Sequence, residues 1–367
     1  MSEAWTEYKF KEVATAVKGK LPKNKNEVGV GVPYLTANYL RTNEPDYWIE
    51  NHDGAVTADE GDCLILWDGA GAGDLFTAKH GVVSSTMAVV TTEHPDINRN
   101  FFTLLISSKA DYIKETCRGT TVPHVSPDAL SNMVLAIPPL NSQKRIVDLI
   151  SSIDAYIEAL RQQLASAAKS REAVLHELLT AGGVDWADTT FGDMADWSSG
   201  KYLEKDFRVD DGIYPVIGAN GEIGKTNRYL YDQPLVIVGR VGSCGETYVS
   251  EGKVWISDNA LIAAPRENVI VRFLYLLLKT FDYREIISGT TQPLITQGKL
   301  KVQTVPLPPL SEQKRIVEVI SSMDDVASAL EQTKEQAKIL RSGLLADLLS
   351  GEHEIPANYD DARGADE

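Results

Sequence analysis

The chain has 367 residues, of which 43% are hydrophobic and 24% are charged, and 52 acidic against 36 basic residues give a formal net charge of −16. This length allows two domains, and no run reaches the roughly 18 apolar residues that cross a bilayer, so no membrane segment is expected. Three cysteines without CxxC spacing fit a reduced, cytoplasmic setting better than a disulfide framework or a zinc site. The negative charge argues against non-specific nucleic-acid binding through long-range attraction.

Residues 1–140 form a first module with the pattern of irregular β structure. Short apolar runs such as LILW and AVV are separated by glycine and aspartate. A helix is expected over residues 101–116, FFTLLISSKADYIKET. The glycine loop GAGAGD at 69–74 does not have the GxGxxG spacing of a dinucleotide site. The module is therefore predicted to be β-rich, with few helices and no nucleotide site.

Residues 141–182 predict one long helix. Asn141 is the expected N-cap, and Gly182-Gly183 is the expected end. Apolar residues recur at alternating steps of four and three, with one interruption at Arg171, and a sustained period of 3.5 indicates a coiled-coil seam. The seam residues are Ile146, Ile150, Ile153, Ile157, Leu160, Leu164, Ala167, Val174 and Leu178.

Residues 183–310 repeat the β-rich pattern, with runs such as LVIV and ALIAA and an expected helix at 271–287. The stretch ANGEIGKT at 219–226 fits a relaxed phosphate-loop pattern. That loop requires a helix that opens at the Lys-Thr pair, so that backbone N–H groups and the helix dipole meet the phosphates. The residues that follow, NRYLYDQPLVIV, have an extended pattern, so no nucleotide site is expected.

Residues 311–351 predict a second long helix, with Ser311 as N-cap and Gly351 at its end. Lys334 and Arg341 interrupt its seam, and the acidic tail at 352–367 has no helical pattern and is expected to be disordered. The seam residues are Ile316, Ile320, Met323, Ala327, Leu330, Ala337, Leu344 and Leu348.

The two helices begin with nearly the same text, PPLNSQKRIVDLISSID at 138–154 and PPLSEQKRIVEVISSMD at 308–324. At this offset of 170 positions, about 25 of the 63 pairs that begin at Gly119/Gly289 are identical, which indicates two copies of one module. Two helices that each expose an apolar seam can stabilise each other by pairing. An antiparallel pair would relate the two copies by a local two-fold axis. Two amphipathic helices on separate cores are the alternative. The predicted fold class is α+β, with two β-rich mixed modules separated by two long helices that pair as a pseudo-two-fold symmetric, antiparallel coiled coil.

No catalytic motif is found, whereas several loop residues are candidates for binding. The Gly-Thr-Thr triplets at 119–121 and 289–291 recur in register, and small hydroxyl side chains can donate to phosphates or base edges. On glycine-rich loops, Asp68 could accept from a cytosine amino group and Arg240 is of the type that most often reads guanine. Ordinary turns and surface loops are the alternatives. The complete candidate set is Thr120, Thr121, Thr290, Thr291, Asp68, Arg240, Ser243, Lys225, Asn38 and Asn220.

The motif PPL-x-x-QKRIV-x-x-ISS-x-D followed by a long helix, present twice, resembles the two conserved regions of the specificity subunit of type I restriction–modification systems, and the resemblance covers almost the whole chain. It implies target-recognition domains at 1–140 and 183–310, a central conserved spacer helix at 141–182 and a distal one at 311–351. Each recognition domain would read one half of a bipartite double-stranded DNA sequence, and the helices would set the gap between the halves.

The resemblance further implies a non-catalytic subunit that docks two modification (methyltransferase) subunits, which motor/nuclease restriction subunits then join. No cofactor is expected in this chain, whereas S-adenosylmethionine, Mg and ATP are expected in the partner subunits. The net charges of about −6 for residues 1–140 and −3 for 184–307 leave much of the phosphate neutralisation to those partners. A protein–protein scaffold with two β-rich modules on a coiled-coil strut is the alternative function, and the missing motifs oppose a self-contained modifying enzyme.

Overall fold

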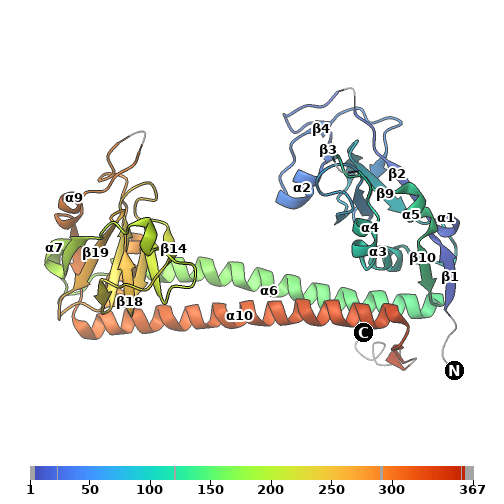
Figure 1. The fold of residues 1–367 in the computed structure, drawn as a ribbon. Helices are drawn as coiled ribbons and strands as arrows, with labels where there is room; N and C mark the ends of the chain where they lie inside the picture. The colour runs from blue at the N-terminus through green and yellow to red at the C-terminus, as the bar shows by residue number, and fades with distance from the viewer. Residues whose placement is uncertain (1–4, 23, 120, 290–291, 357, 360–367) are drawn as a thin grey trace. The chain divides into compact units, whose positions relative to one another are not determined.

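The computed structural model describes residues 5–22, 24–119, 121–289, 292–356 and 358–359. The chain divides into unit 1, Met1–Leu160 with Thr333–Glu367, and unit 2, Arg161–Gln332. Each unit contains one β-rich module and part of both long helices, α6 (Leu140–Thr180) and α10 (Leu310–Ser350), as Figure 1 shows. The predicted α+β class is confirmed. None of the helices in the described ranges is long and apolar enough to cross a membrane.

The module of unit 1 is built on two four-stranded sheets. The main sheet has the order β2-β9-β6-β7 and is antiparallel, and the second has the order β4-β3-β8-β5 with β3 and β8 parallel. Their strands are β2 (Thr15–Lys18), β3 (Val32–Leu35), β4 (Trp48–Ile49), β5 (Thr57–Ala58), β6 (Cys63–Leu66), β7 (Leu75–Thr77), β8 (Gly81–Val83) and β9 (Met87–Thr91). The module also contains the helices α1 (Phe10–Val13), α2 (Ala37–Thr42), α3 (Arg99–Ser107), α4 (Ala110–Glu115) and α5 (Pro127–Asn132).

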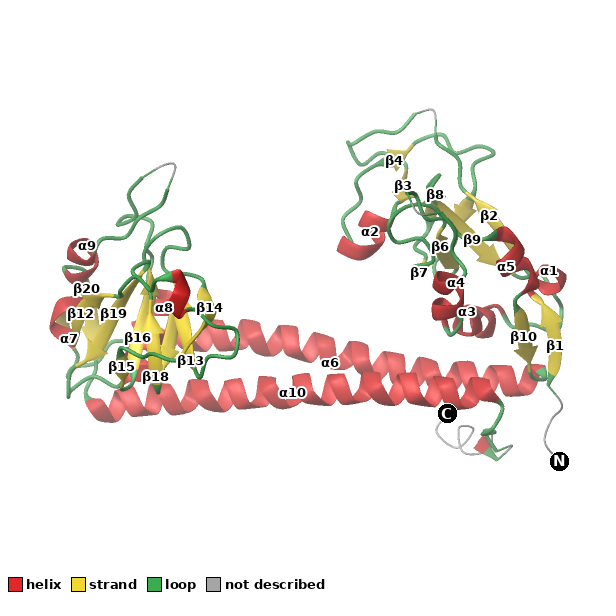
Figure 2. Cartoon of the chain, in the orientation of Figure 1, coloured by secondary structure: helices red, strands yellow, loops and turns green. Residues whose placement is uncertain are grey.

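Unit 2 has the same topology. Its main sheet has the order β12-β19-β16-β17, and its second sheet has the order β14-β13-β18-β15 with β13 and β18 parallel (Figure 2). Its strands are β12 (Ala195–Ser199), β13 (Tyr214–Gly218), β14 (Gly221–Thr226), β15 (Tyr231–Asp232), β16 (Leu235–Gly239), β17 (Thr247–Ser250), β18 (Lys253–Ile256) and β19 (Ala260–Pro265). Its helical segments are α7 (Phe191–Met194), the 3-10 turn η1 (Lys205–Phe207), α8 (Val271–Thr280) and α9 (Gln297–Lys301).

Each module is attached through a two-stranded antiparallel ribbon. In unit 1, β1 (Thr6–Lys9) pairs with β10 (Val134–Ile137), and in unit 2, β11 (Ala187–Thr190) pairs with β20 (Thr304–Leu307). The second strand of each ribbon leads, through a Pro-Pro pair, into a long helix. The chain therefore reaches and leaves each module at the same place.

Helices cover the main sheets because their apolar residues recur at helical spacing. In unit 1, Phe101 and Leu105 of α3 are buried in one cluster with Ile150 of α6. In unit 2, Phe273 of α8 is buried in one cluster with Ile320 of α10. The first turns of each long helix are thus part of a module's core.

Within each unit the two long helices run side by side in opposite directions (Figure 1). In unit 1, Arg341 of α10 forms a bidentate ion pair with Asp154 of α6, with Nη2 2.8 Å from Oδ2. In unit 2, Arg171 of α6 pairs in the same way with Asp324 of α10, at 3.0 Å. The two aspartates are 170 positions apart, as are the two arginines. The arginines that interrupt the seams therefore form ionic links, and the link in one unit recurs in the other at the repeat offset.

The seam positions are the less exposed residues of both helices. Ile146, Ile150, Ile316 and Ile320 are at most 3% exposed. Of the other predicted seam residues, Leu160, Ala337 and Leu348 are buried and the rest are half-buried, namely Ile153, Ile157, Leu164, Ala167, Val174, Leu178, Met323, Ala327, Leu330 and Leu344.

Both module helices are shorter than predicted. The single helix expected at 101–116 is wrong: α3 ends at Ser107, and α4 begins at Ala110. The hydroxyls of Ser107 and Ser108 bond back to carbonyl groups of their own helix, an alternative to continued helix. The helix expected at 271–287 ends at Thr280, because Phe281 turns extended and packs its ring edge-on against Phe191.

The predicted N-caps are also wrong. The carbonyl of Pro139 accepts from the N–H of Gln143 at 3.1 Å and that of Pro309 from Gln313 at 3.0 Å, so the prolines stand at the cap position. Asn141 and Ser311 lie inside the first turns. The predicted glycine ends are confirmed, because Gly182 and Gly351 follow the last turns with φ of +63° and +75°.

Candidate functional site

The described residues that flank the Gly-Thr-Thr segments pair through their backbones. Arg118 pairs with His124, and Ser288 pairs with Leu294. Gly119 and Gly289 have φ of +95° and +88°, and a Cβ on either would lie 2.6 Å from a carbonyl oxygen of its own loop. Only glycine fits such positions without strain. Of the threonines predicted as binding residues, Thr121 is exposed, and the others lie outside the described residues, namely Thr120, Thr290 and Thr291.

These loops lie against the glycine-rich loops at one end of each main sheet, which we call the loop end. In unit 1 its described residues are 18–21, 67–74, 83–87, 118–119 and 121–124. In unit 2 they are 199–202, 239–245, 256–260, 288–289 and 292–294.

Equivalent backbone hydrogen bonds join the segments of both loop ends. In unit 1 they are Gly19 N to Met87 O at 2.9 Å, Trp67 N to Thr86 O at 2.7 Å and Gly69 N to Pro123 O at 2.9 Å. In unit 2 they are Gly200 N to Ala260 O at 3.1 Å, Arg240 N to Asn259 O at 3.0 Å and Gly242 N to Pro293 O at 3.2 Å. The two modules therefore keep one backbone framework while their side chains differ.

The structure places Asp68 and Arg240 on this framework, each held by the residue that ends the first strand of its main sheet. Asp68 forms an ion pair with Lys18 at the end of β2. The Nη1 of Arg240 donates to the hydroxyl of Ser199 at the end of β12 at 3.2 Å, and its Nε is buried without a hydrogen-bond partner among the described residues. Lys18 and Ser199 were missed in the sequence, where nothing marks them except their place before a glycine.

The remaining candidates divide into two groups. Ser243 lies on the Arg240 loop, and the turn that carries Asn220 touches that loop, because a Cβ on Gly239 would lie 2.5 Å from the carbonyl oxygen of Ala219. Lys225 is exposed on β14, within the antiparallel β13–β14 hairpin formed by the phosphate-loop-like stretch. Asn38 lies on α2, and its amide donates to Asp46 at 3.0 Å.

The glycine-rich loop of unit 1 is anchored by Asp74. The Oδ2 of Asp74 lies 2.6 Å from Arg41 Nη2 of α2, and its Oδ1 lies 2.9 Å from Lys114 Nζ of α4. The hydrogen bond from Lys114, with further help from Arg41, lowers the pKa of Asp74 below its ordinary value. A lowered carboxyl pKa contributes stability above the ordinary Asp pKa, and this is lost as the pH falls through the folded-state value.

Asp74→Asn is expected to speed hydrogen exchange of the backbone amides of residues 69–74, because two cations lose their shared carboxylate. The loop at 240–245 of unit 2 provides an internal control, since both ion-pair partners of Asp74, Arg41 and Lys114, belong to unit 1. Exchange mass spectrometry of the full chain checks this, and unchanged exchange at 69–74 would show that the backbone framework alone holds the loop.

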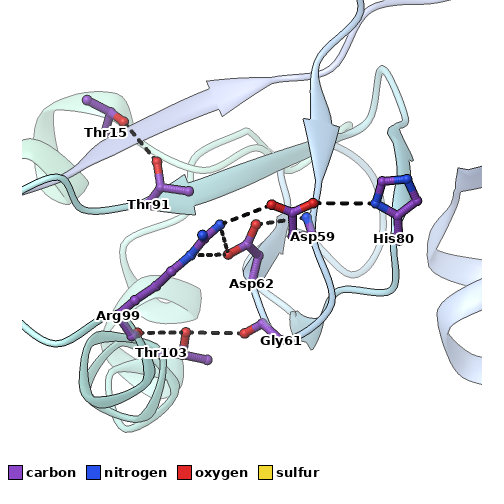
Figure 3. Close-up of polar contacts among 8 residues, drawn as sticks. All are labelled: Thr15, Asp59, Gly61, Asp62, His80, Thr91, Arg99 and Thr103. Atoms are coloured by element: carbon purple, nitrogen blue, oxygen red, sulfur yellow. Dashed lines mark hydrogen bonds and ion pairs between the residues drawn. The ribbon is translucent and has the colours of Figure 1, made fainter.

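A second polar cluster, in Figure 3, belongs to unit 1 and joins α3 to the turn between β5 and β6. The guanidinium of Arg99 lies 2.6 Å from the carboxylate of Asp62, whose side chain is 5% exposed. Arg99 also lies 3.8 Å from Asp59, which lies 3.4 Å from His80 Nδ1. A buried carboxylate requires such a partner. Arg99 is the first residue after the N-cap of α3, and the first residue after the N-cap of α8 is Val271. Unit 2 therefore has no arginine at the equivalent position, and the cluster is specific to one module.

The sequence analysis missed Gln143 and Gln313, which are fully buried at the same repeat position. The Oε1 of Gln143 accepts from Asn98 N at 2.7 Å, and its Nε2 donates to Asp96 O at 2.8 Å and Pro138 O at 2.7 Å. The Oε1 of Gln313 accepts from Ile270 N, and its Nε2 donates to the carbonyls of Asn268 and Pro308, all at 2.9 Å. Each glutamine thus fastens the start of α3 or α8 to a long helix, and we call it the glutamine clamp. Its only sequence signal is identity within the repeated QKR.

Exposed basic side chains border both loop ends, despite the acidity of the chain. In unit 1 they are Lys18, Lys20 and Arg118, and in unit 2 they are Lys201 and Lys299 beside the half-buried Arg240. Asp68, Asp74 and the exposed Asp258 are the acidic side chains in the same segments. The loop end is therefore more basic than the chain as a whole.

Other site chemistry is not seen in the parts of the chain that the structure describes. They contain no group of three or more His, Cys, Asp or Glu side chains that could hold a metal ion. Burial, with a contribution from Asp62, raises the pKa of the Cys63 thiol to about 12. Desolvation also raises the pKa of Cys117 and Cys244, so no thiol is activated.

Comparison with known proteins shows one consistent likeness. Residues 2–168 and 183–341 match the family described as Type I restriction modification DNA specificity domain. The Type I restriction enzyme MjaVIII specificity subunit of Methanocaldococcus jannaschii is 25% identical, over 95% of this chain and 93% of that protein.

Two solved structures share the fold. The S subunit of a type I restriction–modification system from M. genitalium has a TM-score of 0.57 and 16% identity, over 94% of this chain and 96% of the other. A chain solved in work on complex assembly and conformational transition of the type I R-M system has a TM-score of 0.64 and 18% identity, over 94% of this chain and 97% of the other. At these identities the structural likeness concerns the fold alone.

Proposed function

Because this chain belongs to the type I restriction modification DNA specificity domain family, we propose that the loop end of each unit reads one half of a bipartite DNA sequence. The chain is a specificity subunit with two recognition domains and is not a catalytic subunit.

The observation that carries the proposal is the pair of matched loop ends. Both use the same backbone framework but present different side chains on it. The matched hydrogen bonds pair Arg240 with Trp67 and Asp68 with Val241, so Asp68 and Arg240 lie at neighbouring rather than equivalent positions, contrary to the sequence alignment. A carboxylate accepts from the cytosine amino group, whereas a guanidinium donates to the O6 and N7 of guanine. One framework that presents an acceptor in one unit and a donor in the other is what two readers of different half-sites need.

The long helices support a role as a spacer between the half-sites. Each has 41 residues, which corresponds to about 60 Å at 1.5 Å per residue. The paired Arg–Asp links fix the antiparallel register within each unit. The helices would thereby determine the number of unread base pairs between the two halves.

The assembly would supply what this chain lacks. Two modification subunits would dock on the helices and adjoining surfaces, motor/nuclease restriction subunits would join them, and S-adenosylmethionine, Mg and ATP would bind in those partners. With a net charge of −16 on this chain, part of the phosphate neutralisation would also come from the partners, because non-specific DNA affinity depends on Lys and Arg contacts.

Replacing residues 6–137 by the matching segment of another family member is expected to change one half-site of the methylated sequence and leave the other half and the gap unchanged. The ribbon of β1 and β10 delimits this segment, so both junctions fall at one place. Methylome sequencing of cells that carry the complete system checks this. A change in both halves, or methylation without any bipartite site, would contradict the proposed division of labour.

A further inference from the structure

Two exposed apolar side chains occupy the same position in the two loop ends. Leu21 follows Gly19-Lys20 and is 70% exposed, and Tyr202 follows Gly200-Lys201 and is 63% exposed. Each stands three residues after the side chain that holds Asp68 or Arg240. The proposed function and the predicted binding residues assign no role to either one.

The backbone before these side chains is fixed. A Cβ on Gly19 would lie 2.1 Å from the carbonyl oxygen of Val83, and one on Gly200 would lie 2.0 Å from that of Ser257. In unit 2 the N–H of Lys201 also donates to Ile256 O at 2.8 Å, and its carbonyl accepts from the indole of Trp255 at 2.9 Å. The loop therefore leaves the sheet at a close-packed glycine and then exposes a lysine and an apolar residue.

A single exposed apolar residue on a protein surface needs no explanation. Here an exposed apolar residue recurs at the same position of both modules, although the side chains that surround this position have diverged. This recurrence calls for an explanation. A lysine next to an apolar side chain, beside base-reading candidates, matches the chemistry of a duplex: the ammonium suits a phosphate, and the apolar group suits the face of a base pair.

We propose that Leu21 and Tyr202 are apolar wedges that press into a base step of their half-sites, with Lys20 and Lys201 on adjacent phosphates. This rests on the proposed function and adds to it a second kind of readout. Wedge insertion costs unstacking energy, and that cost depends on the base step, being least at pyrimidine–purine steps. The wedges would therefore favour deformable steps without hydrogen bonds to bases.

The test uses the assembled complex with its modification subunits and a duplex that contains its own target, with 2-aminopurine placed at one position at a time. Unstacking raises the fluorescence of 2-aminopurine. The methylated adenine is flipped out during methylation and gives its own signal, so that position is mapped first and set aside. We expect one further bright step in each half-site.

Leu21→Ala is expected to abolish the bright step in the first half-site, and Tyr202→Ala that in the second, each with a roughly tenfold loss of affinity, as for removal of one stacked side chain. Leu21→Met and Tyr202→Phe should retain both signals. The matched controls are Val28→Ala and Ile213→Ala, which shorten apolar residues that are 82% and 74% exposed away from the wedge positions, and they should change nothing.

Two results would overturn the wedges. One is an unchanged signal and affinity in both alanine variants, and the other is loss of a modification subunit in place of loss of DNA affinity, which native mass spectrometry detects. Continued methylation of a bipartite site in either case would leave the proposed function standing. If the unaltered complex methylated no bipartite site, the proposed function would itself fail.

Discussion

Gln143→Leu is expected to lower the free energy of unfolding of the chain by about 3 kcal/mol or more, because leucine leaves one N–H and two carbonyl groups buried without partners. The amide is fully buried, so water cannot replace it. Gln313→Leu is expected to act similarly in unit 2. Urea denaturation of the full-length variants, read as the shift of the midpoint at constant slope, checks both expectations.

The matched control is Gln163→Leu, the same substitution at an exposed position of α6, which should change the free energy of unfolding by no more than a few tenths of a kcal/mol. Gln143→Glu keeps the shape of the side chain but turns an oxygen toward the carbonyls of Asp96 and Pro138. It should be at least as destabilising as leucine at neutral pH. A near-neutral Gln143→Leu would show that the glutamine clamp does not hold the module to the helix.

Insertion of seven residues after Gln162 and seven after Gln332 is expected to lengthen the unread gap while both half-sites stay the same. These glutamines occupy the same repeat position, and seven residues are two turns of the 3.5-residue seam, so the pairing register is kept. The added rise is about 10 Å, or about three base pairs at 3.4 Å each. Methylome sequencing reads the gap directly.

The control for this experiment is the same insertion in one helix only. It shifts the seam of α6 past that of α10, so that one of the two Arg–Asp links can no longer form, and it should abolish methylation at the lengthened site. A changed half-site with a constant gap after the double insertion would overturn the spacer role of the helices.

The helices could be predicted from the sequence because their signals are local and doubled. The 4-3 spacing and the offset of 170 positions indicated two paired rods, and Gly182 and Gly351 marked their ends. The N-cap predicted at Asn141 and the single helix predicted across residues 107–110 were wrong. At both places two arrangements of side chains or backbone compete within one turn of the helix. Propensity alone does not decide between them.

The loop ends could be predicted only as separate loops. Gly-Thr-Thr and the glycine-rich segments were recognised, but the hydrogen bond that joins Gly69 to Pro123 spans distant parts of the sequence. The glutamine clamp was missed for another reason. Glutamine is mostly an exposed residue, and its burial here depends on the carbonyl groups of Asp96 and Asn268, which lie just before α3 and α8 and which no periodicity reveals.

The attachment ribbons leave each recognition module free to change its size over evolutionary time. The chain between the ribbon strands extends from Thr6 to Ile137 in unit 1 and over the shorter stretch from Ala187 to Leu307 in unit 2. Both strands of a ribbon pair side by side, so residues gained or lost inside a module do not displace the helix that follows. A recognition module, and with it the DNA sequence that we propose it reads, can therefore change in evolution without a change in the two long helices.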